Sequence, residues 1–420
     1  MLKQLQAIRT SQTIEFRVFT GATAIGVLHA LDDAVINRQP GVPVTRHLLA
    51  LAVVTVCALL AVWLFTRVRP GFRSALCLLT GVLMVINGTL HVIHILLLGP
   101  ERSDVTGALA FVAGAVLISL GLVIPYRHRR EASRNTVRRW GNRLIALVAT
   151  AVVAQFFVLP VGIGMVQTHK FREAVGEPPT ADFSPVEFES SDGLTLTGWY
   201  RPSDNGAAVV IVNSAAGDRS GSTDHGELLA RHGYGVLMYD ARGTGGSEGS
   251  PNGWGWDWEY DVEGALDFLQ EQPDVDPQRL GGLGLSTGAD VLIQVAASNP
   301  DLRVVISDGA TGMSFADRPP GTIQVPFVWT MFAAGQLFSG TSPGAPLKEL
   351  AAQVSPTPLF LIATGSLPAE LIANKRYAAA AEEPVELWEL PEVTHTNGID
   401  EVAEEYERRV IDQLDSALLE

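Results

Sequence analysis

Five apolar stretches near the start of this chain constrain its fold more than any other feature. Each is close to the ~20 residues that an α-helix needs to cross the hydrocarbon core of a bilayer. Asp32 and Asp33 interrupt the first stretch, and the fifth contains Pro160, which a membrane helix tolerates as a kink. We therefore expect an all-α transmembrane bundle of about five helices within residues 1–170, with spans near residues 16–37, 47–65, 75–98, 105–126 and 144–166.

The charge of the chain is divided at the same place. Residues 1–171 hold 17 Lys and Arg against 6 Asp and Glu, whereas the remaining residues hold 13 against 39. Such an asymmetry indicates a membrane module joined to an acidic, well-solvated domain. The lipid bilayer is therefore the expected partner. Nucleic acid is disfavoured, because an acidic domain repels phosphates.

Basic residues in the short loops predict the orientation of the spans. The loop between the fourth and fifth spans, PYRHRREASRNTVRRWGNR, carries seven arginines. The loop between the second and third spans and the N-terminal segment are also basic, so we expect all three on the cytoplasmic side. Five crossings then place the acidic domain outside the plasma membrane. The N-terminal segment lacks a signal-peptide pattern, so the first span is expected to be retained.

After a linker at 171–182, the pattern changes to alternating strands and helices. Residues 186–202 predict a hairpin with its turn at 191–193, and further buried strands alternate with helical segments. This alternation favours a mostly parallel sheet with covered faces over residues 183–420. A lid is expected at about 311–352, because 323–338 is an unusually apolar helical segment.

One motif in this domain points to nucleophilic catalysis. Gly284-Leu285-Ser286-Thr287-Gly288 matches G-x-S-x-G, between a predicted strand at 280–284 and a predicted helix at 289–297. In that context the serine occupies a sharp strand-to-helix turn, and the glycines allow the strand and the helix to approach closely. We therefore predict Ser286 as a nucleophile.

Several segments in the order SSDGLTLTGWYRP, YDARGTGGSEG and DVEGALDFLQEQPDVDPQRLGGLGLSTGAD resemble the α/β-hydrolase superfamily. The likeness is to its dienelactone-hydrolase and prolyl-oligopeptidase-like branches and covers about 183–420. It implies an α/β-hydrolase fold and a serine hydrolase that works through a Ser-His-acid triad and an acyl-enzyme. No diffusible cofactor is required by such an enzyme.

The resemblance also implies the partners of Ser286. His395, just after the predicted strand at 385–390, stands where the family places its base, which would carry the proton. For the acid we favour Glu370, the nearest carboxylate after the preceding strand, over Asp308 at the end of an earlier strand. The oxyanion hole would use the backbone N–H groups of Thr287 and Ala215.

Two other groups of residues leave alternatives open. The run Trp254, Trp256, Trp258 and Tyr260 either walls an acyl pocket or packs beneath the edge of the sheet. In the membrane half, ionisable side chains lie on single helix faces, at i, i+3 and i+4 of the first span and i, i+3 of the third. They form either a Zn²⁺ or Fe²⁺ site or a hydrogen-bond network between helices. The candidates are His29, Asp32, Asp33, His91 and His94.

We therefore expect a membrane-anchored serine hydrolase that cleaves an ester, thioester or amide, with a small hydrophobic acyl compound as its substrate. The alternative is a membrane protein whose activity lies in the intramembrane His/Asp site, with a non-catalytic hydrolase-like domain as its sensor. The sequence gives neither the substrate nor the oligomeric state.

Overall fold

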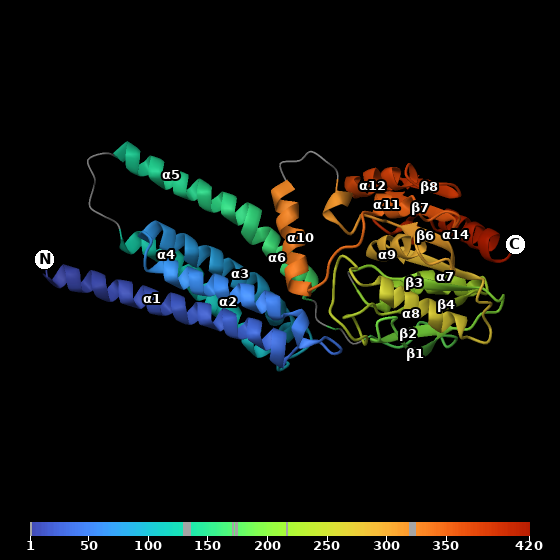
Figure 1. Ribbon diagram of the computed structural model, residues 1–420, viewed down its shortest axis with the longest axis horizontal. Helices are drawn as coiled ribbons and strands as arrows, with labels where there is room; N and C mark the ends of the chain where they lie inside the picture. The colour runs from blue at the N-terminus through green and yellow to red at the C-terminus, as the bar shows by residue number, and fades with distance from the viewer. Residues whose placement is uncertain (1, 129–135, 170–171, 173–174, 216, 319–324) are drawn as a thin grey trace. The chain divides into compact units, whose positions relative to one another are not determined.

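The computed structural model describes residues 2–128, 136–169, 172, 175–215, 217–318 and 325–420 (Figure 1). The chain divides into two compact units. The helical unit comprises Met1–Arg38, Pro43–Val166 and Ile323–Gly340, and the α/β unit comprises Gln39–Val42, Gln167–Thr322 and Thr341–Glu420. Most of the arginine-rich loop predicted between the fourth and fifth spans lies outside the described residues.

The helical unit contains five helices that match the five expected stretches. Its helices long and apolar enough to cross a membrane are Thr13–Ile36, Leu48–Phe65, Pro70–Leu97, Asp104–Arg127 and Arg143–Thr168, each within a few residues of the predicted stretch. Two of them contain a π-helical turn. The elements are α1 (Leu2–Leu31), η1 (Asp32–Ile36), η2 (Val44–Arg46), α2 (Leu48–Phe65), α3 (Pro70–Leu97), α4 (Asp104–Arg127), α5 (Thr136–Val153), η3 (Ala154–Val158), α6 (Leu159–Thr168) and α10 (Val325–Ser339).

Small residues hold α3 and α4 together along a seam that repeats every seven positions. Ser74 meets Gly121, Gly81 meets Gly114, and Gly88 meets Gly107. A methyl group on Gly114 would lie 2.7 Å from the carbonyl oxygen of Gly81, so the two backbones are in direct contact. Lipid offers no hydrophobic drive for association between helices, so this close packing and the hydrogen bond from Ser74 Oγ to the Gly121 carbonyl stabilise the pair.

The apolar segment predicted as part of a lid is helix α10, and it packs within the helical unit. A methyl group on Gly164 would lie 2.8 Å from Ala334 Cβ, so α6 and α10 approach closely. His47 Nδ1 donates to the Phe338 carbonyl at 3.1 Å. The expected lid at 311–352 is thus divided between the two units. The physical reason is that α10 has a face of small residues that fits another helix, whereas Trp329 on its other side is 61% exposed.

The α/β unit is built on one eight-stranded sheet, in the order β1-β2-β4-β3-β5-β6-β7-β8. Strands β1, β2 and β4 pair antiparallel, and every later pair is parallel. The predicted hairpin at 186–202 is β1 and β2, and the predicted strand at 385–390 is β8. The strands are β1 (Ser184–Glu189), β2 (Thr195–Arg201), β3 (Ala208–Val212), β4 (Gly235–Tyr239), β5 (Leu280–Leu285), β6 (Leu302–Asp308), β7 (Leu359–Thr364) and β8 (Val385–Leu390).

Helices cover both faces of this sheet (Figure 1). Side chains of a strand alternate between its faces, and β5 shows which helix covers which. A methyl group on Gly281 would contact Leu414 and Leu418 of α14, whereas one on Gly282 would contact Leu292 of α9. The fold is therefore the expected α/β-hydrolase type. Its helical elements are η4 (Arg219–Ser222), α7 (Thr223–Arg231), α8 (Glu259–Gln270), α9 (Thr287–Ala296), η5 (Phe315–Asp317), α11 (Leu347–Ala351), α12 (Pro368–Ala378), α13 (Gly398–Glu401) and α14 (Ala403–Leu418).

The seam between α3 and α4 predicts that alanine substitution has different effects on stability at two glycines. Gly114→Ala should destabilise the helical unit by about 1–3 kcal/mol, because the added methyl group overpacks a backbone contact. Gly21→Ala is the matched control, since a methyl group there meets no atom within 4 Å and alanine is the better helix former. Thermal unfolding of the purified protein in detergent measures both. Equal melting temperatures for the two variants would contradict the seam.

Candidate active site

Ser286 lies on a strained turn between β5 and α9. Its backbone has φ +53° and ψ −112°, outside the regions that side chains normally favour. The turn is tight, because a methyl group on Gly284 would lie 2.5 Å from Ala289 N and one on Gly288 would lie 2.0 Å from the Val212 carbonyl oxygen. The two glycines of the motif are therefore required sterically. The amide of Ser286 donates to the carbonyl of Asp308 at 2.7 Å, which ties the turn to the end of β6.

The structure brings Ser286, His395 and Glu370 together as one hydrogen-bonded chain. Ser286 Oγ lies 2.9 Å from His395 Nε2, and His395 Nδ1 lies 2.6 Å from Glu370 Oε2. Glu370 is fully buried, and its carboxylate also accepts the backbone N–H of Thr364 at 2.6 Å. An ionised carboxylate only accepts hydrogen bonds, so Nδ1 of His395 carries the proton. Nε2 then offers its lone pair to the hydroxyl of Ser286.

The environment of His395 raises its basicity. Burial alone would lower its pKa, but the hydrogen bond and the charge of Glu370 outweigh burial and raise the pKa above its ordinary value of 6.5. The imidazole is therefore a stronger base than a free histidine, and its protonated form is stabilised by Glu370. Both properties suit a group that takes a proton from a hydroxyl and later returns it.

The carboxylate of Asp308, the alternative acid, bonds to Tyr406 instead of His395. It is fully buried at the end of β6, and its Oδ2 accepts from the Tyr406 hydroxyl at 2.9 Å. Among the described residues it has no hydrogen bond to His395. Burial raises the pKa of Asp308 to about 7, since only one of its oxygens has a donor and the nearby charge of Glu370 adds to the effect. Its side chain therefore lacks the contact that an orienting acid needs.

The predicted oxyanion donors lie on the two loops that meet at the turn. Thr287 begins α9, so its N–H is one of the helix N-terminal donors without an intrahelical acceptor. Ala215 lies in the loop after β3, the strand whose Val212 carbonyl touches the turn at Gly288. Residue 216 lies outside the described residues. A helix N-terminus also favours developing negative charge.

Comparison with known proteins bears on this arrangement. Residues 125–401 match the profile of the X-Pro dipeptidyl-peptidase (S15) family. The chain belongs to the S15 family. An uncharacterized protein of Mycobacterium tuberculosis is 31% identical over 227 residues, which cover 50% of this chain and 72% of that protein.

Two further similar proteins are named for their activities. A thiohydrolase of Aspergillus aculeatus, AneE, is 34% identical over 130 residues, which cover 30% of this chain and 41% of that protein. An esterase of Pyrococcus furiosus has 22% identity and a TM-score of 0.48, and the match covers 59% of this chain and 97% of the esterase. The S15 profile over residues 125–401 identifies the chain as a serine hydrolase of the α/β type, and the expected superfamily is confirmed.

Several residues of this S15 protein that support the catalytic residues were not predicted from its sequence. Gly309, at φ +83°, packs against the imidazole, and a methyl group there would lie 2.8 Å from His395 Cε1. Asp290, one turn after Ser286, accepts the backbone N–H groups of Thr311 and Gly312 at 2.8 and 3.0 Å. The sequence feature that could have predicted the role of Asp290 is an aspartate four residues after the nucleophile.

The aromatic run before α8 packs rather than lining a surface. Trp254, Trp256 and Trp258 are buried, and the first two stack with ring centroids 4.9 Å apart. Trp256 Nε1 donates to the Met313 carbonyl at 2.8 Å, so this cluster supports the loop after β6. Tyr260 remains 39% exposed.

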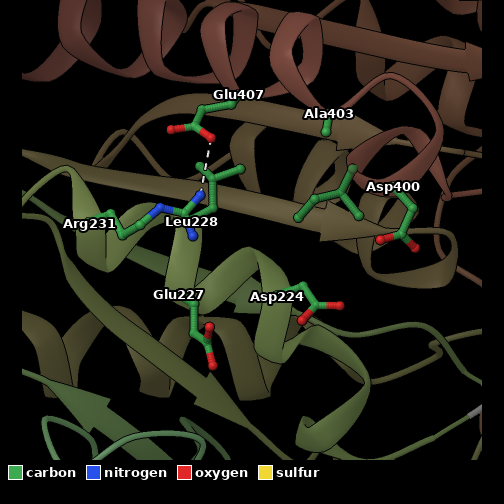
Figure 2. A pocket seen from close by; sticks show the side chains of 8 residues that line it. Asp224, Glu227, Leu228, Arg231, Asp400, Ala403 and Glu407 are labelled. Carbon is green, nitrogen blue, oxygen red and sulfur yellow. Dashed lines mark hydrogen bonds and ion pairs between the residues drawn. The ribbon is translucent and has the colours of Figure 1, made fainter.

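The surface hollow in Figure 2 is a separate feature of the α/β unit. It is lined by charged residues of α7, α13 and α14, and Arg231 pairs with Glu407 across it at 3.1 Å. No member of the Ser286 site lines it. Its lining residues are Asp224, Glu227, Leu228, Arg231, Ile399, Asp400, Ala403 and Glu407.

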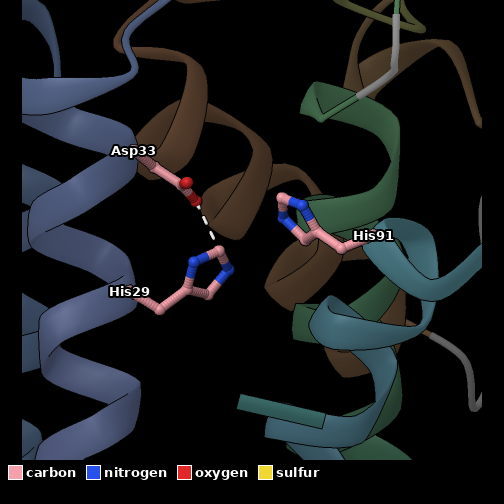
Figure 3. Close-up of side chains that lie close together, drawn as sticks. All are labelled: His29, Asp33 and His91. Carbon is pink, nitrogen blue, oxygen red and sulfur yellow. Dashed lines mark ion pairs between the residues drawn. The ribbon is translucent and has the colours of Figure 1, made fainter. Parts of the chain in front are cut away.

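In the helical unit, three of the predicted metal candidates converge. His29, Asp33 and His91 each offer a ligand atom, and these atoms all lie within 4.8 Å of one another (Figure 3). His94 is not in this group: its Nδ1 bonds to Asp104 Oδ2 at 2.8 Å. Asp104, at the start of the fourth span, was missed from the sequence. The feature of the sequence that could have indicated it is a carboxylate at the first residue of an otherwise apolar helix.

The two acid candidates can be separated by isosteric substitution. Glu370→Gln should lower kcat by about 10²–10⁴-fold, because the amide neither fixes the reactive tautomer of His395 nor stabilises the imidazolium. Asp308→Asn should retain kcat within about tenfold, since its side chain bonds to Tyr406. Steady-state kinetics on an activated ester measure both variants. The reverse order would assign the acid to Asp308.

The pH profile tests the same contact independently. Activity requires neutral His395, so it should rise with pH through the pKa of His395, with the midpoint above 6.5. Removing the negative charge in Glu370→Gln should move this midpoint to lower pH. The profile of kcat/KM against pH for the two proteins provides the measurement. An unchanged midpoint in Glu370→Gln would show that Glu370 does not set the basicity of His395.

Proposed function

We propose that this chain hydrolyses acyl compounds with Ser286 as nucleophile, His395 as general base and acid, and Glu370 as the orienting acid. Ser286 Oγ attacks the carbonyl carbon while His395 Nε2 takes the hydroxyl proton. The tetrahedral intermediate expels the leaving group, which takes that proton, and an acyl-enzyme remains. Water then repeats the sequence and releases the acid. The continuous hydrogen bonds from Ser286 to Glu370 are the observation that carries this proposal.

The same observation argues against a non-catalytic sensor domain. A domain without catalysis has no need to keep a serine in a strained backbone conformation, which costs about 1–3 kcal/mol. It also has no need for a buried carboxylate aligned on an imidazole. Both features cost stability, and both have a use in acyl transfer.

The proposed substrate is a hydrophobic acyl ester or thioester that partitions into the bilayer. The five membrane-length helices support an anchored enzyme. In the sequence, the apolar helix α10 lies between segments of the α/β unit, and it packs within the helical unit, so this helix would also lie at the bilayer. The thiohydrolase relative supports thioesters, and the family description supports amides with proline as a further class.

A fluorophosphonate probe tests the catalytic proposal. The wild type should be labelled covalently and Ser286→Ala should not, with a loss of at least ~10³-fold in hydrolysis. Nitrophenyl esters from acetyl to palmitoyl, an acyl thioester and an X-Pro anilide then rank the substrate classes. We expect the longer acyl chains to give the higher kcat/KM. Each added methylene group that is removed from water can contribute about 0.8 kcal/mol of favourable free energy. A folded wild type that resists the probe would contradict the proposal.

The side of the membrane follows from the charge of the loops. We propose an inside N-terminus and an extracytoplasmic α/β unit. In a background with Cys57 and Cys77 replaced by serine, Glu382→Cys should react with an impermeant maleimide on intact cells. Arg69→Cys, in the loop between α2 and α3, is the matched control and should react only after permeabilisation. Labelling of Arg69→Cys alone on intact cells would reverse the topology.

A further inference from the structure

The hydrogen bonds around His29 fix which of its nitrogens carries the proton. Thr106 Oγ1 donates its hydrogen to Asp32 Oδ2 at 2.6 Å. The Thr106 oxygen can then only accept, so the contact of 3.1 Å from His29 Nδ1 is an N–H that donates to it. In the neutral imidazole, Nε2 therefore presents a lone pair. That lone pair faces the carboxylate of Asp33, with Nε2 lying 3.5 Å from Oδ2.

His91 is oriented in the same manner from the opposite helix. Its Nδ1 lies 3.2 Å from Asp104 Oδ1, and the carboxylate accepts that N–H. Nε2 is then the nitrogen of His91 whose lone pair can bind a metal ion. The rings of His29 and His91 meet edge to face, with centroids 4.8 Å apart, and both are buried. Hydrogen-bond acceptors on the far nitrogen of each ring are the pattern that orients metal-binding histidines in proteins.

We infer that His29, Asp33 and His91 bind a divalent first-row transition metal ion within the membrane-spanning helices (Figure 3). The three ligand atoms lie within 4.8 Å of one another, so a cation between them would be attracted to all three. A single proton can join only two of these three groups. A metal ion can bind all of them, and this site does not depend on the hydrolase activity.

The donor set selects the class of metal. Two imidazole nitrogens with one carboxylate oxygen suit Zn²⁺ or Fe²⁺, with a position left open for water, and they do not suit Ca²⁺ or Mg²⁺. Two ligands of a tetrahedral zinc ion lie about 3.3 Å apart when each bond is about 2.0–2.1 Å. The 3.5 Å between His29 Nε2 and Asp33 Oδ2 is close to that separation, and it is long for a direct hydrogen bond.

The backbone also changes at this point. The α-helix of the first span ends at Leu31, and the π-helical turn η1 begins at Asp32. Single π-turns of this kind occur frequently at functional sites, because the extra residue in the turn redirects side chains. Here the turn carries both carboxylates: Asp32 accepts from Thr106 and from Asn37, and Asp33 faces His29.

Zinc content of the purified full-length protein tests the inference. After chelation and reloading with Zn²⁺ alone, the wild type should retain about one ion per chain through desalting. His29→Gln, Asp33→Asn and His91→Gln should each bind at least tenfold more weakly. His128→Gln is the matched control, because His128 pairs with Glu15 in the same unit, outside this cluster. The control should retain zinc like the wild type.

Two further measurements separate a metal site from a network that only holds helices together. Zn²⁺ should raise the melting temperature of the wild type and of His128→Gln but leave that of His29→Gln unchanged. Co²⁺ should give the visible absorption of a four-coordinate ion, weakened 10–100-fold in affinity by Asp104→Asn, which lacks the carboxylate behind His91. A wild type that binds no more metal than the His29→Gln/His91→Gln double variant would overturn the inference, as would an unchanged melting temperature.

Discussion

The turn at Ser286 is the constraint on which the α/β unit depends. A side chain held at positive φ between a central strand and a helix exists only if strand and helix approach within backbone contact. Gly284 and Gly288 allow this approach, and the surrounding sheet supplies the free energy that the strained conformation costs. Strand β5 is buried along its whole length between β3 and β6, so the turn has a rigid base. The nucleophile therefore lies at the end of a fully buried central strand.

The remaining groups of the site reach Ser286 because parallel strands end at one edge of the sheet. Strand β7 ends at Thr364, which donates to Glu370, and β8 ends just before the loop of His395. Strand β6 ends at Asp308, whose carbonyl accepts from Ser286. Residues distant in sequence are thus brought together by topology at the carboxyl ends of the strands. Gly309 then sets how closely the imidazole can approach that edge.

The sequence predicted a structural feature wherever a local pattern is compatible with only one kind of structure. Stretches of membrane length predicted the five spans, and the glycines around Ser286 predicted the turn. The order of motifs, through the family resemblance, predicted the contact between His395 and Glu370. The division of the expected lid between the two units was not predictable in this way. A helix that is apolar on every side has no polar face from which its packing partner could be predicted. The seam of small residues in α3 and α4 was legible as a period of seven, yet its partner and register depend on the antiparallel pairing of two helices.

Asp104 shows why the intramembrane cluster was only half predicted. Its neighbours in sequence give no indication that it faces the third span. The seam places it opposite His91, three residues beyond the pair formed by Gly107 and Gly88. The absence of a side chain at Gly107 leaves room for the His91 ring, since a methyl group there would lie 2.1 Å from it. The packing of small residues thus determines where the polar groups meet.

That position has an electrostatic consequence. Asp32, Asp33 and Asp104 gather within one apolar bundle, and His29 and His91 each donate a hydrogen bond from Nδ1 beside them. Ionised side chains are expensive among membrane helices unless an opposite charge accompanies them. Hydrogen bonds from Thr106 and Asn37 reduce the cost for Asp32, and His91 and His94 do so for Asp104. Asp33 faces Nε2 of His29, and the metal ion that we infer at this point would balance the charge of its carboxylate.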